Sequence, residues 1–372
     1  MGTEVIQVDP DAGYSEAVSR AVDVLRDGGL VAFPTETVYG IAVRADRTQS
    51  VERLRSLKSR VGGQPFTVHI GSPDEVERFV PGLVGPAGRL ARGGWPGPLT
   101  LILPFDVEAA PAAVGLDDDG IRAIAADGSI GLRCPDHSLT SSLLRAVDAP
   151  VVASSANPSG DSPPVSHEGI PAELVREIDL LIAAGPTKHA KSSTIVRADE
   201  SSFTVVREGV YDEPTIRWLA ALRVLFVCTG NTCRSPMAAA LAEQVLAKRL
   251  GCEIRELAGR GIVVESAGTC GGGGKAADNA ISVMARRSID VSGHRSRLLS
   301  RELVEQADYV FAMTHAHRDA VQAVAPSAAD RVVLLLEDED LGDPIGGSEE
   351  EYEKCASVIE RALQSRMQEV TI

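Results

Sequence analysis

The sequence has few cysteines, few aromatic residues and no long hydrophobic run. Six of the 372 residues are cysteine and 4% are aromatic. Six cysteines are too few for a disulfide framework in a chain of this length, so we interpret them as thiols. No apolar stretch approaches the roughly 18 residues of a membrane span, and the first residues lack the apolar core of a signal peptide. These absences argue against a disulfide-stapled secreted protein and against a membrane partner, and they predict a cytoplasmic location.

Basic residues are scarce relative to acidic ones. The chain has 37 Lys and Arg against 52 Asp and Glu, a formal net charge of -15. Strong binding of nucleic acid needs a basic face, so this balance argues against direct nucleic-acid recognition. Small anionic ligands held in local pockets remain compatible with it.

The length and the hydrophobic pattern predict two α/β domains joined by a linker. Up to residue 209, short apolar runs alternate with helical stretches, as in an α/β domain. Residues 210–221 are predicted to be the linker. Residues 222–372 are predicted to form a small doubly wound parallel sheet, because four apolar runs alternate with four amphipathic stretches. The runs are 222–228, 261–268, 307–313 and 331–336, and the stretches are 234–250, 276–287, 315–324 and 349–367.

The stretch VCTGNTCRSP brings two thiols and an arginine into one turn. It lies between a predicted strand and an amphipathic helix, where unpaired N–H groups and the helix dipole favour an anion. Five residues separate Cys228 from Arg234, which lets the loop curl around a tetrahedral dianion while Arg234 holds two of its oxygens. The same donors favour a Cys228 thiolate that attacks phosphorus, and Ser235 can donate its hydroxyl to it. Gly230 and Asn231 suit the close backbone and the left-handed conformation that the curl requires.

This arrangement resembles the low-molecular-weight protein tyrosine phosphatase family over residues 222–369. The resemblance implies a phosphocysteine intermediate on Cys228, which water hydrolyses, with Arg234 as the phosphate-binding arginine. It also implies an acid in a late Asp-Pro loop, which matches Asp343 in LGDPIGGS. The other matching loop residues are Thr229, Gly230, Asn231, Thr232, Cys233 and Ser235. Cys233 could protect Cys228 by forming a disulfide with it, or could be a spectator.

Thr232 and the residues after Asp343 bear on the substrate. Phosphotyrosine enzymes of the family usually have a larger aliphatic residue at this loop position and an aromatic pair after the Asp-Pro. Thr232 together with Gly346-Gly347-Ser348 resembles the protein arginine phosphatase branch, which implies phosphoarginine in proteins as the substrate, although Ile345 departs from the expected aromatic residue. Phosphotyrosine stays as an alternative. Arsenate reductases share the loop but need two further downstream cysteines, and residues 271–354 contain none.

The first domain contains several short motifs in a fixed order. They are GLVAFPTETVYG, KSRVGGQPFTVHI, WPGPLTLIL, GLRCPDH, SSANPSG and SSTIV. Together they resemble the threonylcarbamoyl-AMP synthase family, with its YrdC-like twisted α/β sheet, over residues 14–209. The resemblance implies that L-threonine, bicarbonate and ATP are condensed into threonylcarbamoyl-adenylate. Downstream tRNA threonylcarbamoyl transferase proteins would use that product to modify tRNA.

The resemblance assigns two sets of residues in the first domain. The ATP-binding set is Lys58, Arg60, Gln64, Ser155, Asn157 and Arg207, and the threonine-binding set is Thr37, His69, Arg133 and Ser193. ATP would be a substrate that carries Mg²⁺ on its phosphates, with no tightly bound cofactor and no protein metal site. Val61, Gln64 and Ala190 depart from the family pattern. The sequence therefore predicts a bifunctional enzyme, and the alternative for the first domain is a non-catalytic module that binds nucleotide or RNA.

Overall fold

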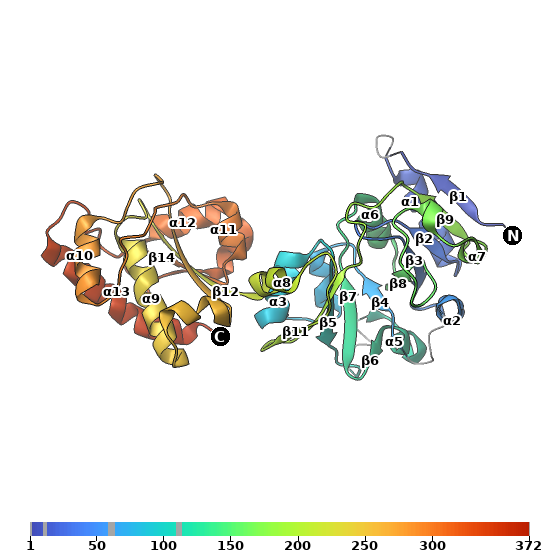
Figure 1. Ribbon diagram of the computed structural model, residues 1–372, viewed down its shortest axis with the longest axis horizontal. Helices are drawn as coiled ribbons and strands as arrows, with labels where there is room; N and C mark the ends of the chain where they lie inside the picture. The colour runs from blue at the N-terminus through green and yellow to red at the C-terminus, as the bar shows by residue number, and fades with distance from the viewer. Residues whose placement is uncertain (1, 10–12, 59–63, 109–113, 372) are drawn as a thin grey trace. The chain divides into compact units, whose positions relative to one another are not determined.

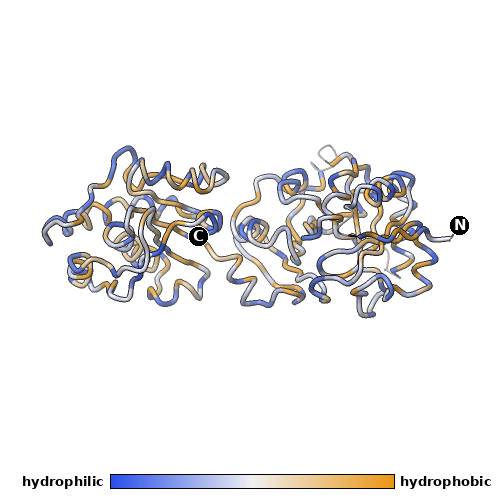
Figure 2. Tube along the Cα trace, turned by 90° about the horizontal axis from the view of Figure 1, so that it is seen from above, coloured by the Kyte–Doolittle hydropathy of each residue, from blue (hydrophilic) through white to orange (hydrophobic). Residues whose placement is uncertain are grey.

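The computed structural model describes residues 2–9, 13–58, 64–108 and 114–371 of the chain. They divide into two compact units, Met1–Ala220 and Ala221–Ile372, each with its own sheet and its own hydrophobic core. Figure 2 shows apolar stretches inside each unit and polar stretches mostly around its outside. None of the described helices is both long and apolar enough to cross a membrane.

Among the described residues, the first unit is built on a mixed sheet of eleven strands (Figure 1). The strand order is β1-β9-β2-β3-β8-β4-β7-β5-β10-β11, with β6 beside β7. The strands are β1 (Glu4–Gln7), β2 (Val31–Phe33), β3 (Gly40–Arg44), β4 (Thr67–His69), β5 (Leu99–Pro104), β6 (Ala125–Ala126), β7 (Ser129–Arg133), β8 (Val151–Ser155), β9 (Leu180–Ala183), β10 (Thr194–Ala198) and β11 (Phe203–Arg207).

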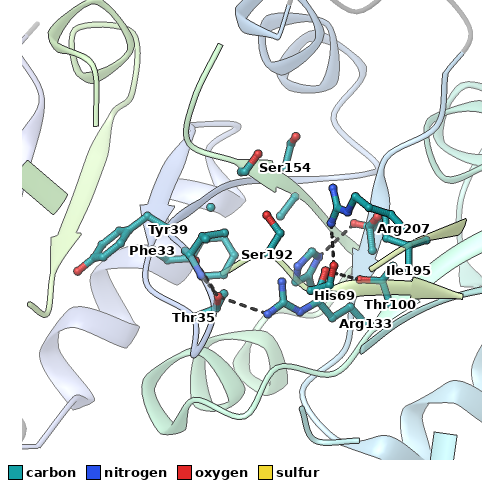
Figure 3. A pocket seen from close by; sticks show the side chains of 16 residues that line it. Phe33, Thr35, Tyr39, His69, Thr100, Arg133, Ser154, Ser192, Ile195 and Arg207 are labelled. Carbon is teal, nitrogen blue, oxygen red and sulfur yellow. Dashed lines mark hydrogen bonds between the residues drawn. The ribbon is translucent and has the colours of Figure 1, made fainter. Parts of the chain in front are cut away.

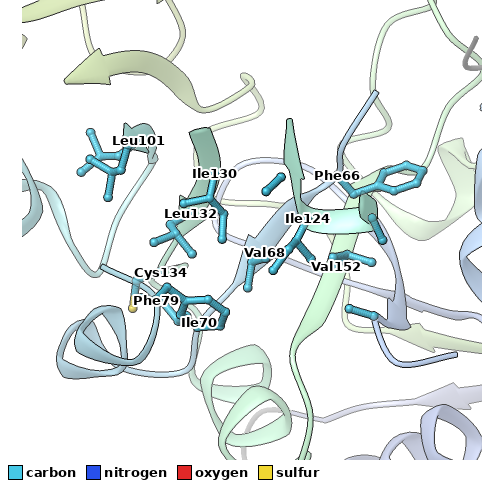
Figure 4. Close-up of a cluster of buried hydrophobic side chains, with 14 of the residues drawn as sticks. Phe66, Val68, Ile70, Phe79, Leu101, Ile124, Ile130, Leu132, Cys134 and Val152 are labelled. Atoms are coloured by element: carbon cyan, nitrogen blue, oxygen red, sulfur yellow. The ribbon is translucent and has the colours of Figure 1, made fainter. Parts of the chain in front are cut away.

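Helices cover both faces of this sheet. Successive side chains of a strand point to opposite faces, so Val31 and Phe33 of β2 pack under α1 and α6 while Ala32 belongs to a second, larger core. Figure 4 shows part of that second core, which includes Phe66, Leu101 and Ile130. The helices are α1 (Ser15–Arg26), α2 (Thr48–Leu57), α3 (Gly85–Gly94), α5 (Asp118–Ile124), α6 (Ser138–Ala146), α7 (Ala172–Val175) and α8 (Glu213–Ala220), with 3-10 turns η1 (Pro73–Arg78) and η2 (His167–Gly169).

The stretch expected as a linker, residues 210–221, contains a packed helix. Ile216 and Ala220 of α8 are buried in the larger core of the first unit, and α8 lies against α3. The Arg89 side chain also donates from Nε to the carbonyl of Ala220 at 2.6 Å. Most of the stretch is therefore a structural part of the first unit.

The second unit has a four-stranded sheet in the order β13-β12-β14-β15, and every pair is parallel. Val224 and Phe226 of β12 face a core formed with α9, α10 and α13, while Leu225 and Val227 face a core formed with α11 and α12. Helices thus cover both faces, which confirms the predicted doubly wound sheet. Its strands are β12 (Leu222–Cys228), β13 (Ile262–Gly268), β14 (Tyr309–Ala312) and β15 (Val332–Leu334).

The central strand β12 positions the candidate site of this unit. It pairs with β13 on one side and β14 on the other, so its carboxyl end lies at the point where the strand order reverses. Ligands of open α/β sheets bind at such a point. The helices of the unit are α9 (Arg234–Leu250), α10 (Asp278–Arg286), α11 (Arg301–Gln306), α12 (His315–Val324) and α13 (Glu349–Glu369), with 3-10 turns η3 (Ile254–Glu256), η4 (Ala258–Arg260) and η5 (Pro326–Arg331).

Candidate active sites

The loop between β12 and α9 surrounds the thiol of Cys228, which is 2% exposed. The backbone N–H of Asn231 donates to Cys228 Sγ at 3.2 Å, and Ser235 Oγ lies 3.0 Å from the same sulfur. Asn231 has a φ of 53°, the left-handed region that asparagine tolerates better than most residues. The sulfur therefore lies where a backbone donor and the N-terminus of the 17-residue helix α9 present partial positive charge.

The side chain of Asn231 links the loop to neighbouring segments by hydrogen bonds. Its Nδ2 donates to Ser235 Oγ at 2.9 Å and to Ser266 Oγ at 2.8 Å, while its Oδ1 accepts the backbone N–H of Arg297 at 3.0 Å. His294 Nε2 lies 2.7 Å from the backbone oxygen of Asn231. Sequence reasoning missed the roles of Ser266 and His294. Ser266 lies near the carboxyl end of β13, the parallel neighbour of β12, and this position is the signal that could have found it.

Arg234 joins the loop to the candidate acid. Its NH1 donates to the carbonyl of Leu341 at 3.0 Å, and its NH2 donates to Thr229 Oγ1 at 3.2 Å and to Asp343 Oδ2 at 2.5 Å. Asp343 follows β15, so it reaches the same sheet edge as Cys228. The structure therefore brings the three expected catalytic residues into one site.

The remaining expected residues of this site differ in burial and in contacts. Thr232 lies near Gly274, where a Cβ would be 3.7 Å from the Thr232 Cγ2 atom. Cys233 Sγ is 3.1 Å from the hydroxyl of Tyr352, and burial together with this contact raises the pKa of Tyr352. Ile345, after the Asp-Pro, is 67% exposed. All six cysteines are free thiols.

In the first unit, a polar cavity of about 140 Å³ lies at the strand ends (Figure 3). Five expected residues line it, namely His69, Arg133, Ser155, Ser193 and Arg207. Ser193 Oγ is 2.9 Å from Thr100 Oγ1, and Arg207 NH2 donates to the backbone carbonyl of Ser193 at 2.9 Å.

The Arg133 guanidinium is held through one nitrogen. NH2 donates to Glu36 Oε1 at 2.9 Å, to Thr37 Oγ1 at 2.6 Å and to Thr35 Oγ1 at 3.4 Å. The Nε atom of Arg133 and the Oε2 atom of Glu36 are buried and have no hydrogen-bond partner among the described residues. The guanidinium therefore keeps donors for a ligand while NH2 is anchored. Sequence reasoning missed Glu36, although it stands next to Thr37 in the same motif.

His69 is a neutral hydrogen-bond acceptor at this cavity. Its Nδ1 lies 3.2 Å from the carbonyl oxygen of Thr67, which can only accept, so Nδ1 carries the hydrogen and Nε2 has the free lone pair. Burial, reinforced by the charge of Arg133, lowers the pKa of His69 to about 3. The imidazole is therefore uncharged at neutral pH.

Lys58 connects two of the other expected ATP-binding residues, Ser155 and Asn157. Its Nζ donates to the carbonyl of Ser155 at 2.8 Å and to the carbonyl of Asn157 over a shorter distance. Gln64 is exposed, and its backbone carbonyl accepts from Arg55 at 2.8 Å. Arg60 and Val61 lie outside the described residues.

Ala190 adopts a conformation that suits glycine. Its φ is 50°, in the left-handed region that costs an alanine about 1–2 kcal/mol. The residue therefore carries backbone strain two positions before the cavity-lining Ser192. Among the described ranges, no group of three or more His, Cys, Asp or Glu side chains could hold a metal ion.

Two family models match the chain. The Sua5/YciO/YrdC model, described as "Telomere recombination", matches residues 23–209, and the model for "Low molecular weight phosphotyrosine protein phosphatase" matches residues 223–371. A threonylcarbamoyl-AMP synthase of Pyrococcus abyssi is 33% identical over 191 residues, 51% of this chain and 53% of that protein. The chain thus spans about half the length of that relative.

Two further comparisons agree with these models. The solved structure of a P. abyssi Sua5 variant has a TM-score of 0.51 and 25% identity, and covers 67% of this chain and 76% of that one. A protein-arginine-phosphatase of Geobacillus stearothermophilus is 39% identical over 147 residues, 38% of this chain and 90% of that protein. The chain therefore belongs to the Sua5/YciO/YrdC family and carries, after this domain, a second domain of the low-molecular-weight phosphotyrosine protein phosphatase family.

Proposed function

We propose that the first domain makes L-threonylcarbamoyladenylate from L-threonine, bicarbonate and ATP for tRNA modification. The observation that carries this proposal is the pairing of an anchored Arg133 with a neutral His69 in one small polar cavity. Arg133 can bind the carboxylate of an amino acid with its remaining donors. His69 Nε2 can accept a hydrogen bond from a hydroxyl or an amine of the same ligand.

The nucleotide would bind beside the amino acid. Arg207 and Lys58 supply positive charge next to Ser155, and attack of the threonine carbamate on the α-phosphate is helped by charge neutralisation and alignment. Mg²⁺ prefers phosphate and water oxygens, so it would arrive on the triphosphate and supply further neutralisation. The Ser155 hydroxyl, which lines this cavity, could supply an oxygen ligand to this Mg²⁺.

Pyrophosphate release by the purified chain tests this proposal. We expect release to require both threonine and bicarbonate, and Arg133→Ala to abolish it while the phosphatase activity persists. Cys228→Ser is the matched control, because it changes the other domain and should leave pyrophosphate release intact. Release at the same rate without threonine would contradict the synthase reaction, and no release at all would favour the non-catalytic nucleotide-binding module.

For the second domain we propose dephosphorylation of phosphoarginine in proteins. The observation that carries it is the contact of the Asn231 N–H and Ser235 Oγ with the Cys228 sulfur, with Arg234 on the candidate acid Asp343. The Cys228 thiolate attacks phosphorus, the P–N bond breaks, and Asp343 gives its proton to the departing guanidine nitrogen. Water then attacks the phosphocysteine, its proton passes to Asp343, and phosphate and the thiolate are released.

The substrate is tested with matched phosphopeptides. We expect a higher kcat/KM for a phosphoarginine peptide than for a phosphotyrosine peptide of otherwise equal sequence, because Thr232 leaves room and a hydroxyl for the guanidino group. Cys228→Ser should remove both activities, since an alcohol is not ionised under these conditions. A preference for phosphotyrosine would establish the alternative substrate.

A further inference from the structure

The hydroxyl of Thr229 lies between the phosphate-binding arginine and a buried histidine. Thr229 Oγ1 accepts from Arg234 NH2 at 3.2 Å and lies 2.9 Å from His317 Nε2. The other ring nitrogen of His317, Nδ1, is 2.8 Å from Thr314 Oγ1. His317 is 6% exposed and lies in the first turn of α12.

One arrangement uses the donors and acceptors of this series of hydrogen bonds without leaving the Thr229 hydrogen unused. A guanidinium only donates, so Thr229 accepts from Arg234, and its single hydroxyl hydrogen is then donated to His317 Nε2. In this arrangement Nε2 accepts, and the ring hydrogen on Nδ1 is donated to Thr314. Thr314 also caps α12 by accepting the backbone N–H of His317 at 3.3 Å, so the Thr314 end of this series of hydrogen bonds is fixed.

Protonation of His317 would reverse the hydrogen bond between Thr229 Oγ1 and His317 Nε2. Both ring nitrogens would then donate, and Thr229 would have to accept from His317 and from Arg234 while its own hydrogen lost its acceptor. Among the facing groups, Arg234 opposes this charge and Asp343 and Asp340 favour it. The charged or titratable residues of α12 itself are His315, Arg318 and Asp319. Burial and Arg234 together lower the pKa of His317, which keeps it neutral at pH 7.

We propose that His317 is a positioning residue that holds the Arg234 guanidinium through Thr229, and that it does so as the neutral Nδ1–H tautomer. The inference rests on the proposed phosphatase function of the second domain. Without the hydrogen bonds through Thr229, Arg234 would keep its contacts with Leu341 and Asp343 only. Both of these residues lie on the segment that follows β15. The Thr229 contact is the one that ties the guanidinium to the phosphate loop itself.

The tautomer can be read directly by NMR on the full chain with ¹⁵N-labelled histidine. The signals of His317 are assigned by their loss in His317→Gln. We expect a neutral ring with hydrogen on Nδ1 at pH 7 that titrates below the ordinary pH range of histidine. Hydrogen on Nε2, or a charged ring at pH 7, would overturn the proposal.

Kinetics show whether the histidine acts through the threonine. We expect His317→Leu to raise the inhibition constant of inorganic phosphate and to lower kcat/KM, by up to about 100-fold for a misplacement of about 1 Å. His317→Gln should recover part of this loss, because its amide oxygen can accept from Thr229. His315→Gln on the same helix is the matched control and should change neither constant, since His315 is exposed and pairs with Asp340.

A double-mutant cycle with Thr229→Val decides the route. If the effect passes through Thr229, adding His317→Leu to Thr229→Val should cost no more than Thr229→Val alone. Additive losses would overturn the proposal, even where each variant is folded. Thermal unfolding is measured for each variant, and if His317→Leu does not fold, the tautomer and the His317→Gln constants still decide.

The role of His317 and the phosphatase activity are tested by different measurements. A wild-type chain that hydrolyses neither phosphopeptide would remove the phosphatase proposal. Binding of inorganic phosphate and the tautomer of His317 would still be measurable in that case, and Nε2–H would overturn the inference independently.

Discussion

Arg234 and Asp343 form a 2.5 Å ion pair that joins the first residue of α9 to the candidate acid. Both Asp343 and a phosphate dianion are anions that suit the same guanidinium, so bound substrate would compete with Asp343 for NH2. The contact of NH1 with the carbonyl of Leu341 would persist through this exchange. Asp343 would then be free to approach the leaving group.

Replacing the acid should affect the two substrate classes unequally. We expect Asp343→Asn to slow phosphotyrosine hydrolysis more than phosphoarginine hydrolysis, because phenolate departs poorly without a proton while a guanidine nitrogen is protonated readily. The measurement is kcat for matched peptides. Asp340→Asn is the control, since Asp340 pairs with the exposed His315. Equal slowing of both substrates would contradict the role of Asp343 as the acid.

Enlarging the loop residue should change the preference of the pocket. Thr232→Ile removes a hydroxyl and adds apolar surface, so we expect the ratio of kcat/KM for phosphoarginine over phosphotyrosine to fall by roughly tenfold to a hundredfold, or about 1–3 kcal/mol. Thr232→Ser keeps the hydroxyl and should change the ratio less. An unchanged ratio in Thr232→Ile would show that the residue has only a structural role in the loop.

Glu36 should matter for threonine more than for ATP. The charge-assisted contact between Glu36 and Arg133 is buried, and its loss costs about 1.5–3 kcal/mol, which corresponds to a roughly tenfold to hundredfold rise in KM for threonine. We expect Glu36→Ala to show this rise with a small change in KM for ATP, measured by pyrophosphate release. Glu52→Gln, in an exposed pair with Arg55, is the control. Equal effects on both KM values would indicate general disruption instead.

Gly268 is required where β13 approaches the phosphate loop. A Cβ there would lie 2.7 Å from the backbone oxygen of Thr229 and 3.0 Å from the backbone N of Asn231, and neither atom can move without moving the loop. We expect Gly268→Ala to destabilise the second unit by about 1–3 kcal/mol and to reduce phosphatase kcat/KM. Gly293→Ala is the control, because a Cβ there meets nothing within 4 Å. Denaturant unfolding that is unchanged in Gly268→Ala would contradict this close approach.

The buried histidine of the first unit should make its stability depend on pH. The pKa of His69 is about 3 in the folded chain and about 6.5 in the unfolded one, so the unfolded state binds the extra proton. The contribution of His69 to the free energy of unfolding is fully present above about pH 6.5. It is lost as the pH falls towards 3, by about 1.4 kcal/mol per pH unit. Denaturant unfolding at pH 7 and pH 5 should show this slope in the wild type and a smaller one in His69→Gln. Parallel slopes would contradict the burial of a neutral His69.

Elements with local signals can be predicted from the sequence alone. The four strands of the second unit and the helices after them follow from apolar runs and amphipathic periods, and the candidate catalytic loop follows from the residues between β12 and α9. The interactions that form these elements join residues close in sequence, because a helix N-terminus and a loop that curls on an anion are formed by neighbours in the chain.

Tertiary structure alone decided the features that depend on distant partners. β1 is a strand because it pairs with β9, with Glu4 opposite Leu180, and its own sequence is short and mostly exposed. Glu36 became a site residue through Arg133, 97 positions away, and His317 through Thr229, 88 positions away. No local pattern encodes such contacts, since a buried polar side chain is placed by the partner that satisfies it, and that partner is brought near by the fold.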